Sequence, residues 1–390
     1  MLAGVIDLAF NVGHGLEISP PNYVRSILGD WNSWSTAACP PTELQLAQLR
    51  EWNRGLPALA HILIPALPWE VRGVRFPFSD LLFRPAVVFR YPAESDASNP
   101  TPNESWFFIN GICTDHSVVL INARYLRELF KRPLTVLHNF TRGFIPDLAA
   151  CAVGKEWDRV TESAAVAFPH LYAALKDEKY KRIILLAHSQ GTILSAVILA
   201  LLQHLHPSTH AQFASAKDDE IAPERRVARR LAGRWRFELT MHPPKSGEKA
   251  GPPTFEWPRY GRRQPERVSS EEMQKLEIYC FANCASEMVA VRRAKQTPTP
   301  WIESYGNEKD IVARYGVLAN VSGPGSVRID GDRYERHDAW GHLLNAHYLF
   351  PMMKDLKAGN PRAGLTPLKR NWFPTPRLFD YLGGNSPPHL

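Results

Sequence analysis

Residues 187–191, Ala-His-Ser-Gln-Gly, place Ser189 between two apolar runs. The run before the serine, residues 182–187, is predicted to be a buried strand, and residues 193–205 are predicted to form an apolar helix. A serine on a sharp strand-to-helix turn is typical of a nucleophile elbow, in which the turn exposes the hydroxyl and the following helix favours developing negative charge. We therefore expect Ser189 to attack carbonyl groups. Ala187 stands where the usual pattern has glycine, and it is still small enough for such a turn.

Backbone N–H donors for an oxyanion are expected close to the nucleophile. The first is the N–H of Gln190, the residue after the serine. Residues 105–111 (SWFFING) predict an earlier strand that ends in a turn, where Gly111 permits a close approach of the backbone. We expect the N–H of Ile112 to be the second donor and Cys113 to line the pocket. The alternatives are a plain β-turn and a nucleophilic Cys113, which lacks an elbow of its own.

The acid of a triad is expected between the serine and a late histidine, because chains with an elbow of this kind carry their triad in the order Ser, Asp or Glu, His. Residues 301–316 (WIESYGNEKDIVARYG) offer Glu303 within a predicted strand, and Glu308 and Asp310 in the loop after it. Asp310 is favoured because it precedes the apolar residues 311–313, where a buried carboxylate can be held. Glu308 is the second choice.

Four late histidines are candidates for the general base: His337, His342, His347 and His389. His342 is favoured because Gly341 before it leaves room for the ring and a helix is predicted to begin close to it. His347 lies roughly 140° further round that helix, so the two rings do not easily face one site. His347 and His337 remain alternatives. In this arrangement the histidine takes the serine proton and the acid orients the imidazole.

Further side chains close to the predicted elbow are candidates for lining a substrate pocket. Residues 138–143 (HNFTRG) follow a predicted strand at the same edge of the sheet, although a loop that only caps its strand is the alternative. The pocket candidates are Gly111, Cys113, His188, Asn139 and Thr141.

The elements that must position these residues follow an α/β pattern. From residue 86 onward, short apolar strands alternate with longer helices, which is typical of a mostly parallel sheet flanked by helices. The core is predicted over residues 86–205 and 271–350. Residues 1–85 are interpreted as an N-terminal extension that could cover the pocket, residues 206–270 as a basic insertion and candidate lid, and residues 351–390 as a Pro-rich tail.

Four stretches together resemble the α/β-hydrolase superfamily: NGICTD, AHSQGT, YGNEKDIVARYGVLA and WGHLLNAHYL. They look most like a subgroup of uncharacterised microbial and fungal serine hydrolases, and the resemblance covers about residues 100–205 and 275–350. It implies a catalytic triad of Ser189, Asp310 and His342. Two features depart from the family pattern. The first motif glycine is an alanine, and the insertion lies before the strand KLEIYCFA, whereas many relatives carry their cap after the equivalent strand.

The charge balance and the cysteines exclude several other classes. The chain of 390 residues has a net charge of +7, and residues 211–270 alone hold thirteen Lys and Arg against eight Asp and Glu, a surplus of five. We find no clustered basic face or nucleic-acid-binding motif, so no nucleic acid is expected as a partner. The five cysteines form no zinc or disulfide pattern, and nothing in the sequence indicates a metal ion or an organic cofactor.

The first residues argue against secretion. They lack a basic stretch, and Asp7 interrupts their apolar run, so no signal peptide is predicted. No apolar run approaches the roughly 18 residues that a membrane-spanning helix needs. Together with the reduced thiols that irregular cysteine spacing suggests, these features predict a cytoplasmic protein.

The leading functional hypothesis is a serine hydrolase that forms an acyl-enzyme on an ester or thioester. The substrate is expected to be a small acyl compound, and the Trp, Phe and Pro of the extension and the tail favour an apolar one. Acyl transfer, lactonisation or cyclisation by the same triad is one alternative. A non-catalytic binding protein with this fold is another, and a membrane-surface role for the basic residues 224–236 is a third. The sequence does not indicate which oligomeric state the protein adopts.

Overall fold

The central element of the structure, a computed structural model, is an eight-stranded sheet. The structure describes residues 25–26, 29, 43, 87–92, 101–111, 116–138, 157–209, 221–234, 266–291, 299–319, 327–368 and 375–388. The sheet has the strand order β1-β3-β2-β4-β5-β7-β9-β10. The strands are β1 (Val87–Tyr91), β2 (Glu104–Ile109), β3 (Leu134–His138), β4 (Arg182–His188), β5 (Leu276–Phe281), β7 (Trp301–Asn307), β9 (Asp332–Arg336) and β10 (Leu365–Pro367).

Six of these strands, β3 to β9 in spatial order, run parallel, and the prediction of a mostly parallel sheet is confirmed. Only the two edge strands are antiparallel, β1 to β3 and β10 to β9. The central strands β4 and β5 are buried at every position. Strands that are covered on both faces read as continuous apolar runs, which is why residues 182–187 and 276–281 show no alternation in the sequence.

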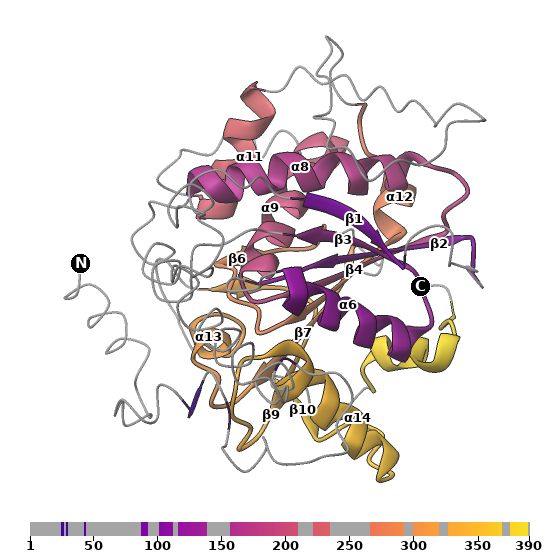
Figure 1. Cartoon of the computed structure of the whole chain (residues 1–390). Coiled ribbons are helices and arrows are strands. Elements are labelled where there is room, and N and C mark those ends of the chain that lie inside the picture. The colour runs from indigo at the N-terminus through magenta and orange to yellow at the C-terminus, as the bar shows by residue number, and fades with distance from the viewer. Residues whose placement is uncertain are drawn as a thin grey trace, which may run out of the picture.

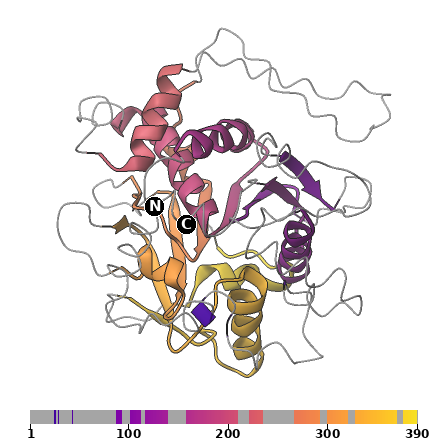
Figure 2. The ribbon, with the colours of Figure 1, turned by 60° about the vertical axis from the view of Figure 1, so that its left-hand side comes forward.

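Helices cover both faces of the sheet, as Figures 1 and 2 show, with α8, α9 and α11 gathered on one face and α6 and α14 on the other. The helix α9 is buried along nearly its whole length because it lies between the sheet and α11. The helices and helical turns are α6 (His116–Phe130), α8 (Trp157–Lys176), α9 (Gln190–Leu205), α11 (Pro223–Arg234), α12 (Ser270–Gln274), α13 (Ile311–Tyr315), the π-helical turn η3 (Leu344–Leu349), α14 (Phe350–Lys357) and the 3₁₀ segment η4 (Arg377–Gly384).

The parallel strands place three chain segments at one edge of the sheet. Because β4, β7 and β9 run in the same direction, their carboxyl ends meet at that edge. Ser189 directly follows β4, Asp310 follows β7 and His342 follows β9. A separate two-stranded parallel sheet pairs β6 (Glu287–Met288) with β8 (Arg328–Ile329).

Residues 206–270, interpreted from the sequence as a basic insertion, include the helix α11, which packs against the core. On α11, Val227, Ala228 and Leu231 are buried against α9 and α8. Glu224 in its first turn accepts a 2.7 Å hydrogen bond from the backbone N–H of Ser286, in the segment after β5. The arginines of this segment obscured a helix whose apolar positions follow the spacing i, i+1, i+4. The rest of the candidate lid lies largely outside the described residues.

Residues 351–390 were interpreted from the sequence as a Pro-rich tail. Their described part, residues 351–368 and 375–388, instead packs against the core. Helix α14 continues from η3, β10 adds the last strand to the sheet, and η4 packs against α6. Within η4, Leu378 and Tyr381 are fully buried, and the Tyr381 ring meets Trp106 of β2 at 5.1 Å, edge to face. A three-residue strand and a 3₁₀ segment are too short to produce a periodic pattern, so the prolines dominated the prediction.

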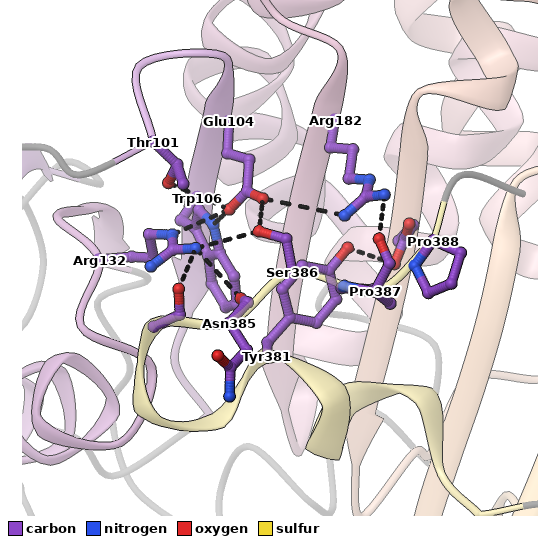
Figure 3. A network of polar contacts seen from close by, with 12 residues as sticks. Thr101, Glu104, Trp106, Arg132, Arg182, Tyr381, Asn385, Ser386, Pro387 and Pro388 are labelled. Carbon is purple, nitrogen blue, oxygen red and sulfur yellow. Dashed lines mark hydrogen bonds and ion pairs between the residues drawn. The ribbon is translucent and has the colours of Figure 1, made fainter.

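The segment after η4 crosses beneath the amino ends of the strands, as Figure 3 shows. Arg132, just before β3, donates to Glu104 at 2.9 Å and to the carbonyl oxygens of Gly384 and Asn385 at 3.0 and 3.1 Å. Ser386 donates to the same Glu104 at 2.5 Å. These hydrogen bonds lower the pKa of Glu104, although burial alone would raise it. The segment therefore satisfies charged groups that the sheet would otherwise bury without partners.

Two further arginines extend this contact across the sheet. Arg182, the first residue of β4, donates to the carbonyl oxygen of Pro387. Arg377 holds Glu277 of β5 through two hydrogen bonds of 3.1 and 3.2 Å, and its backbone N–H donates to Glu303 of β7 at 2.8 Å. Since β4 has seven residues at about 3.3 Å each, this edge lies roughly 20 Å from Ser189. The residues after position 375 therefore do not line the site at the carboxyl edge.

None of the helices that the structure describes combines the length and the apolar character that crossing a membrane requires.

Candidate active site

The turn that carries Ser189 has the strained backbone expected of an elbow. Ser189 has φ 56° and ψ −128°, a conformation that a non-glycine residue adopts only when the surrounding structure holds it. Backbone contacts and the hydroxyl of Thr192, which donates to the Ser189 carbonyl oxygen at 2.7 Å, hold this conformation. The Ser189 N–H donates to the carbonyl oxygen of Phe281 at 2.9 Å, and the Ser189 carbonyl oxygen accepts from the N–H of Thr192 at 2.8 Å. Such strain costs about 1–3 kcal/mol and clusters at functional sites.

The three predicted triad residues form one hydrogen-bonded chain. His342 Nε2 lies 2.8 Å from Ser189 Oγ, and His342 Nδ1 lies 2.8 Å from Asp310 Oδ2. Because an ionised carboxylate only accepts, Nδ1 carries the proton and Nε2 accepts from the serine hydroxyl in the neutral ring. All three side chains are buried. This geometry allows the imidazole to take the serine proton while the carboxylate faces its other nitrogen.

Asp310 is held by three donors. As the N-cap of α13, it accepts a 2.9 Å hydrogen bond at Oδ1 from the N–H of Val312. At Oδ2 it accepts from His342 and, at 2.6 Å, from the hydroxyl of Tyr348. Burial, together with the carboxylate of Asp310, raises the pKa of Tyr348 well above its ordinary value, so this hydroxyl remains a donor. Asp310 is thus fixed in position and in rotamer from two separate elements.

His188 supports the base from the residue next to the nucleophile. Its Nε2 donates a 2.7 Å hydrogen bond to the carbonyl oxygen of His342, and the two rings lie 4.8 Å apart. Burial and the nearby His342 lower the pKa of His188 well below its ordinary value, so the ring is neutral. The structure shows that His188 supports the backbone of His342, and the pocket-lining role predicted for it stays a prediction.

The other acids and histidines weighed as triad members lie elsewhere. Glu303 faces the amino edge, where it accepts from the Tyr305 hydroxyl at 2.5 Å. Glu308 accepts from the N–H of Asp338 at 2.7 Å and lies 3.7 Å from the exposed ring of His337. His347 is buried and accepts from the N–H of Leu343 at Nδ1, 2.9 Å away. His389 lies outside the described residues. Among the candidates in the described part of the chain, His342 is the histidine that joins the serine and an acid.

Two glycines allow the end of β2 to approach the elbow. A Cβ on Gly111 would lie 2.6 Å from Ser189 Cβ, and a Cβ on Gly191 would lie 2.5 Å from the carbonyl oxygen of Ile109. Gly111, which was predicted to permit a close approach of the backbone, therefore lies directly against Ser189. Gln190 is the first residue of α9, and the first N–H groups of a helix have no acceptor within it. Ile112, Cys113, Asn139 and Thr141 lie outside the described residues, so their predicted roles stay predictions.

Several residues that hold the site were missed by the sequence reasoning. Tyr348 and Asn307 lie within the stretches that resemble α/β-hydrolases but were assigned no role there, and Glu43 lies outside those stretches. Their roles depend on contacts formed only in the fold. Asn307 donates from Nδ2 to the carbonyl oxygens of Gly341 and His347 at 3.0 and 3.2 Å, which ties the end of β7 to the histidine loop. The spacing of Tyr348, six residues after the base on a predicted helix, gave no signal that it would reach the acid.

No group of three or more His, Cys, Asp or Glu side chains in the described part of the chain is arranged to hold a metal ion. The chemistry described above needs only protein side chains and backbone donors. Cys280 is buried beside Met288, and burial raises the pKa of its thiol, so it stays protonated. Compared with protein-family models, with curated proteins and with solved structures, the chain matches none of them.

Proposed function

We propose that this protein is a serine hydrolase of the α/β-hydrolase class that acts on an ester or a thioester. The observation that carries the proposal is the hydrogen-bonded chain from Ser189 through His342 to Asp310, with both distances at 2.8 Å. The strained turn between β4 and α9 supports the same reading, because it matches the strand–elbow–helix arrangement of that class. The order of the three residues along the chain, Ser, Asp, His, agrees with it as well.

The proposed reaction begins when Ser189 Oγ attacks the carbonyl carbon and its proton passes to His342 Nε2. Asp310 stabilises the imidazolium that forms, and it keeps the ring oriented through Nδ1. The tetrahedral intermediate collapses, the carbon–oxygen or carbon–sulfur bond to the leaving group breaks, and His342 returns the proton to that group. Water, deprotonated by His342, then attacks the carbonyl carbon of acyl-Ser189. The carbon–oxygen bond to Ser189 breaks, His342 returns the proton to Ser189 Oγ, and the free acid leaves.

The negative charge of the intermediate requires donors at the carboxyl edge. The N–H of Gln190 at the start of α9 is proposed as the first, because the helix N-terminus adds its dipole there. The N–H of Ile112 is proposed as the second. Gly111, one residue before it, lies against Ser189, which supports a close approach of this loop to the reacting carbon.

The substrate is proposed to be a small acyl compound. The composition of residues 351–390 no longer argues for an apolar acyl group, because the part of this segment from residue 375 to 388 lies at the opposite edge of the sheet. Acyl transfer to another nucleophile uses the same acyl-enzyme, and the products distinguish it from hydrolysis. A binding protein without activity would have no need of the strained serine or of its 2.8 Å contact to His342.

A fluorophosphonate probe tests the proposal, because it phosphonylates only an activated serine. We expect labelling of the wild-type protein and its loss in Ser189→Ala. Ser195→Ala is the matched control. Ser195 lies further along α9, with its hydroxyl bound to the Gly191 carbonyl oxygen at 2.9 Å, and its removal should leave labelling intact. Folded wild-type protein that is not labelled, or labelling that survives in Ser189→Ala, would overturn the proposal.

The probe-positive protein should then be incubated with a series of p-nitrophenyl esters and acyl thioesters of increasing chain length. Release of one free acid for each leaving group identifies a hydrolase. A leaving-group burst without free acid, together with a stable acyl adduct on Ser189, would instead identify acyl transfer to a second substrate.

A further inference from the structure

Residues from the N-terminal part of the chain meet the loop that carries His342. The guanidinium of Arg25 lies 4.3 Å from the ring centroid of Trp340. Gly29, with φ 73°, lies so close to His347 that a Cβ there would be 2.4 Å from Nε2 of that ring. Glu43 bonds to η3. Three of the four described residues before position 87 therefore contact residues 340–347, although about 300 residues separate them along the chain.

The Glu43 contact is the most specific of the three. Its Oε1 accepts a 2.9 Å hydrogen bond from the N–H of Asn345, and its Oε2 accepts a 3.0 Å hydrogen bond from the N–H of Ala346. The side chain is buried, and no lysine or arginine in the described part of the chain pairs with it. Glu43 therefore does not serve as an ordinary ion pair. It binds two adjacent backbone donors three and four residues after His342.

The local sequence cannot supply this contact. The first turn of a helix exposes N–H groups that a Ser, Thr, Asp or Asn at the N-cap usually satisfies. The N-cap of η3 is Leu343, which makes no side-chain hydrogen bond. Glu43 takes over the task of a capping residue from a distant segment, and the turn it caps begins two residues after the base.

We propose that Glu43 is a positioning residue for His342, so that the N-terminal segment sets the geometry of the base. This inference rests on the proposed function. Holding the first turn of η3 fixes the backbone on the C-terminal side of His342. On the N-terminal side, Asn307 donates to the carbonyl oxygen of Gly341. His188 holds the carbonyl oxygen of His342 itself. A carboxylate in this place also acts electrostatically on the imidazolium that forms during the reaction. Burial raises the pKa of Glu43, and His342 and the backbone donors oppose that rise.

The test compares full-length variants by the rate of fluorophosphonate labelling of Ser189. Glu43→Gln keeps the size but turns an NH₂ group toward a backbone donor, and Glu43→Asp keeps the charge on a shorter side chain. We expect labelling to slow by about 10- to 100-fold in Glu43→Gln, because small displacements of a catalytic group have effects of this size. Glu43→Asp should recover part of the rate. Glu308→Gln, an acid on the same side of the sheet, should stay within about twofold of wild type, in line with its lack of contact to the triad.

The pH profile of labelling separates positioning from mere stability. His342 is faced by Asp310 and Tyr348, by the neutral His188, and by Glu43. Removing the Glu43 charge disfavours the imidazolium, so the acid limb of the Glu43→Gln profile should move to lower pH, while its plateau falls. A variant that is only less stable would lose labelled protein in proportion to its unfolded fraction, with the limb unmoved. Circular dichroism at each pH measures that fraction.

Two failures can be told apart. If wild-type protein is not labelled, the proposed function fails. If wild-type labelling depends on Ser189 but Glu43→Gln and Glu43→Asp are labelled at the wild-type rate with an unmoved acid limb, the proposed function stands and the role of Glu43 is overturned.

Discussion

The hydroxyl of Tyr348 donates a 2.6 Å hydrogen bond to Oδ2 of Asp310, the same oxygen that lies 2.8 Å from the imidazole of His342. The same hydroxyl accepts a 3.2 Å hydrogen bond from the N–H of Asn307. Tyr348 therefore connects the end of β7 with the acid of the proposed triad. A second donor on a triad carboxylate removes the freedom of that carboxylate to rotate away from the histidine.

We expect Tyr348→Phe to keep the fold and to slow labelling of Ser189 by about tenfold, since it releases Asp310 without removing it. The free energy of unfolding should fall by about 1–3 kcal/mol, because the buried N–H of Asn307 loses its acceptor. Tyr172→Phe is the control: its hydroxyl donates to the carbonyl oxygen of Glu266 far from the triad, and its loss should leave labelling unchanged. Equal labelling rates in both variants would contradict the role assigned to Tyr348.

Asp310→Asn should have a much larger effect on the reaction. The amide NH₂ opposes the His342 Nδ1–H, the Tyr348 hydroxyl or the Val312 N–H, so the imidazole loses its orienting acceptor. A loss of about 10³- to 10⁴-fold in turnover is expected, as for other triads in which the acid becomes an amide. Turnover of the best ester or thioester measures it. A loss below about tenfold would mean that Asp310 only caps α13.

The contact between the elbow and β2 predicts opposite outcomes for two neighbouring small residues. Gly191→Ala places a Cβ about 2.5 Å from a backbone oxygen, so the elbow must shift, and labelling should be lost together with about 1–3 kcal/mol of stability. Ala187→Gly introduces the glycine of the usual motif on a fully buried strand. It should cost about 1 kcal/mol through backbone freedom but keep Ser189 labelled. Labelling of both variants at the wild-type rate would show that the elbow tolerates displacement.

The parts of the candidate site that are contiguous in the sequence could be predicted from it, whereas contacts between distant segments could not. The strand, serine and helix around position 189 are contiguous, and chain order then pointed to Asp310 and His342. In the structure His342 bonds to the serine and Asp310 bonds to His342. Glu43, by contrast, bonds to residues about 300 positions away, and one glutamate in the N-terminal extension gives no sign of so distant a partner. The mostly parallel sheet followed from alternating strands and helices, but β10 has three residues and was hidden among prolines.

The amino edge of the sheet should be important for stability but not for the reaction. Arg132 is fully buried and bonded to Glu104 and to two backbone carbonyl oxygens. Arg132→Met leaves that glutamate without its main cation, and removing one partner of a buried pair costs about 3–5 kcal/mol. Urea denaturation measures this loss. The labelling rate of folded Arg132→Met at low temperature should match wild type, and a slower rate would show that the two edges of the sheet are coupled.

Glu303 makes the stability of the same edge depend on pH. Burial raises its pKa to about 7 from an ordinary 4.5, while the hydroxyl of Tyr305 and the backbone N–H groups of Arg377 and Leu378 act in the opposite direction. The folded protein therefore binds this proton more tightly than the unfolded chain. The stabilising contribution is complete below pH 4.5 and is lost as pH rises through about 7.

The measurement is the free energy of unfolding of wild type and Glu303→Gln between pH 5 and pH 8. Wild type should lose stability relative to the variant as pH rises, by on the order of 1–3 kcal/mol. Comparing the two proteins removes the contribution of Glu224, whose pKa burial also raises to about 7. A difference that is constant over this range would mean that Glu303 stays charged in the folded state.

The crossing of residues 384–388 beneath the strands also has a consequence for synthesis of the chain. By residue 350 a nascent polypeptide contains the serine, the acid and the histidine, yet Arg132 and Arg182 still await the carbonyl oxygens of Gly384, Asn385 and Pro387. The arginines at the amino edge of the sheet can gain these partners only after residues 384–388 have left the ribosomal tunnel. The parts needed for acylation thus exist before the scaffold that holds them is complete, and full activity is expected only after residues 384–388 have emerged and packed against the strands.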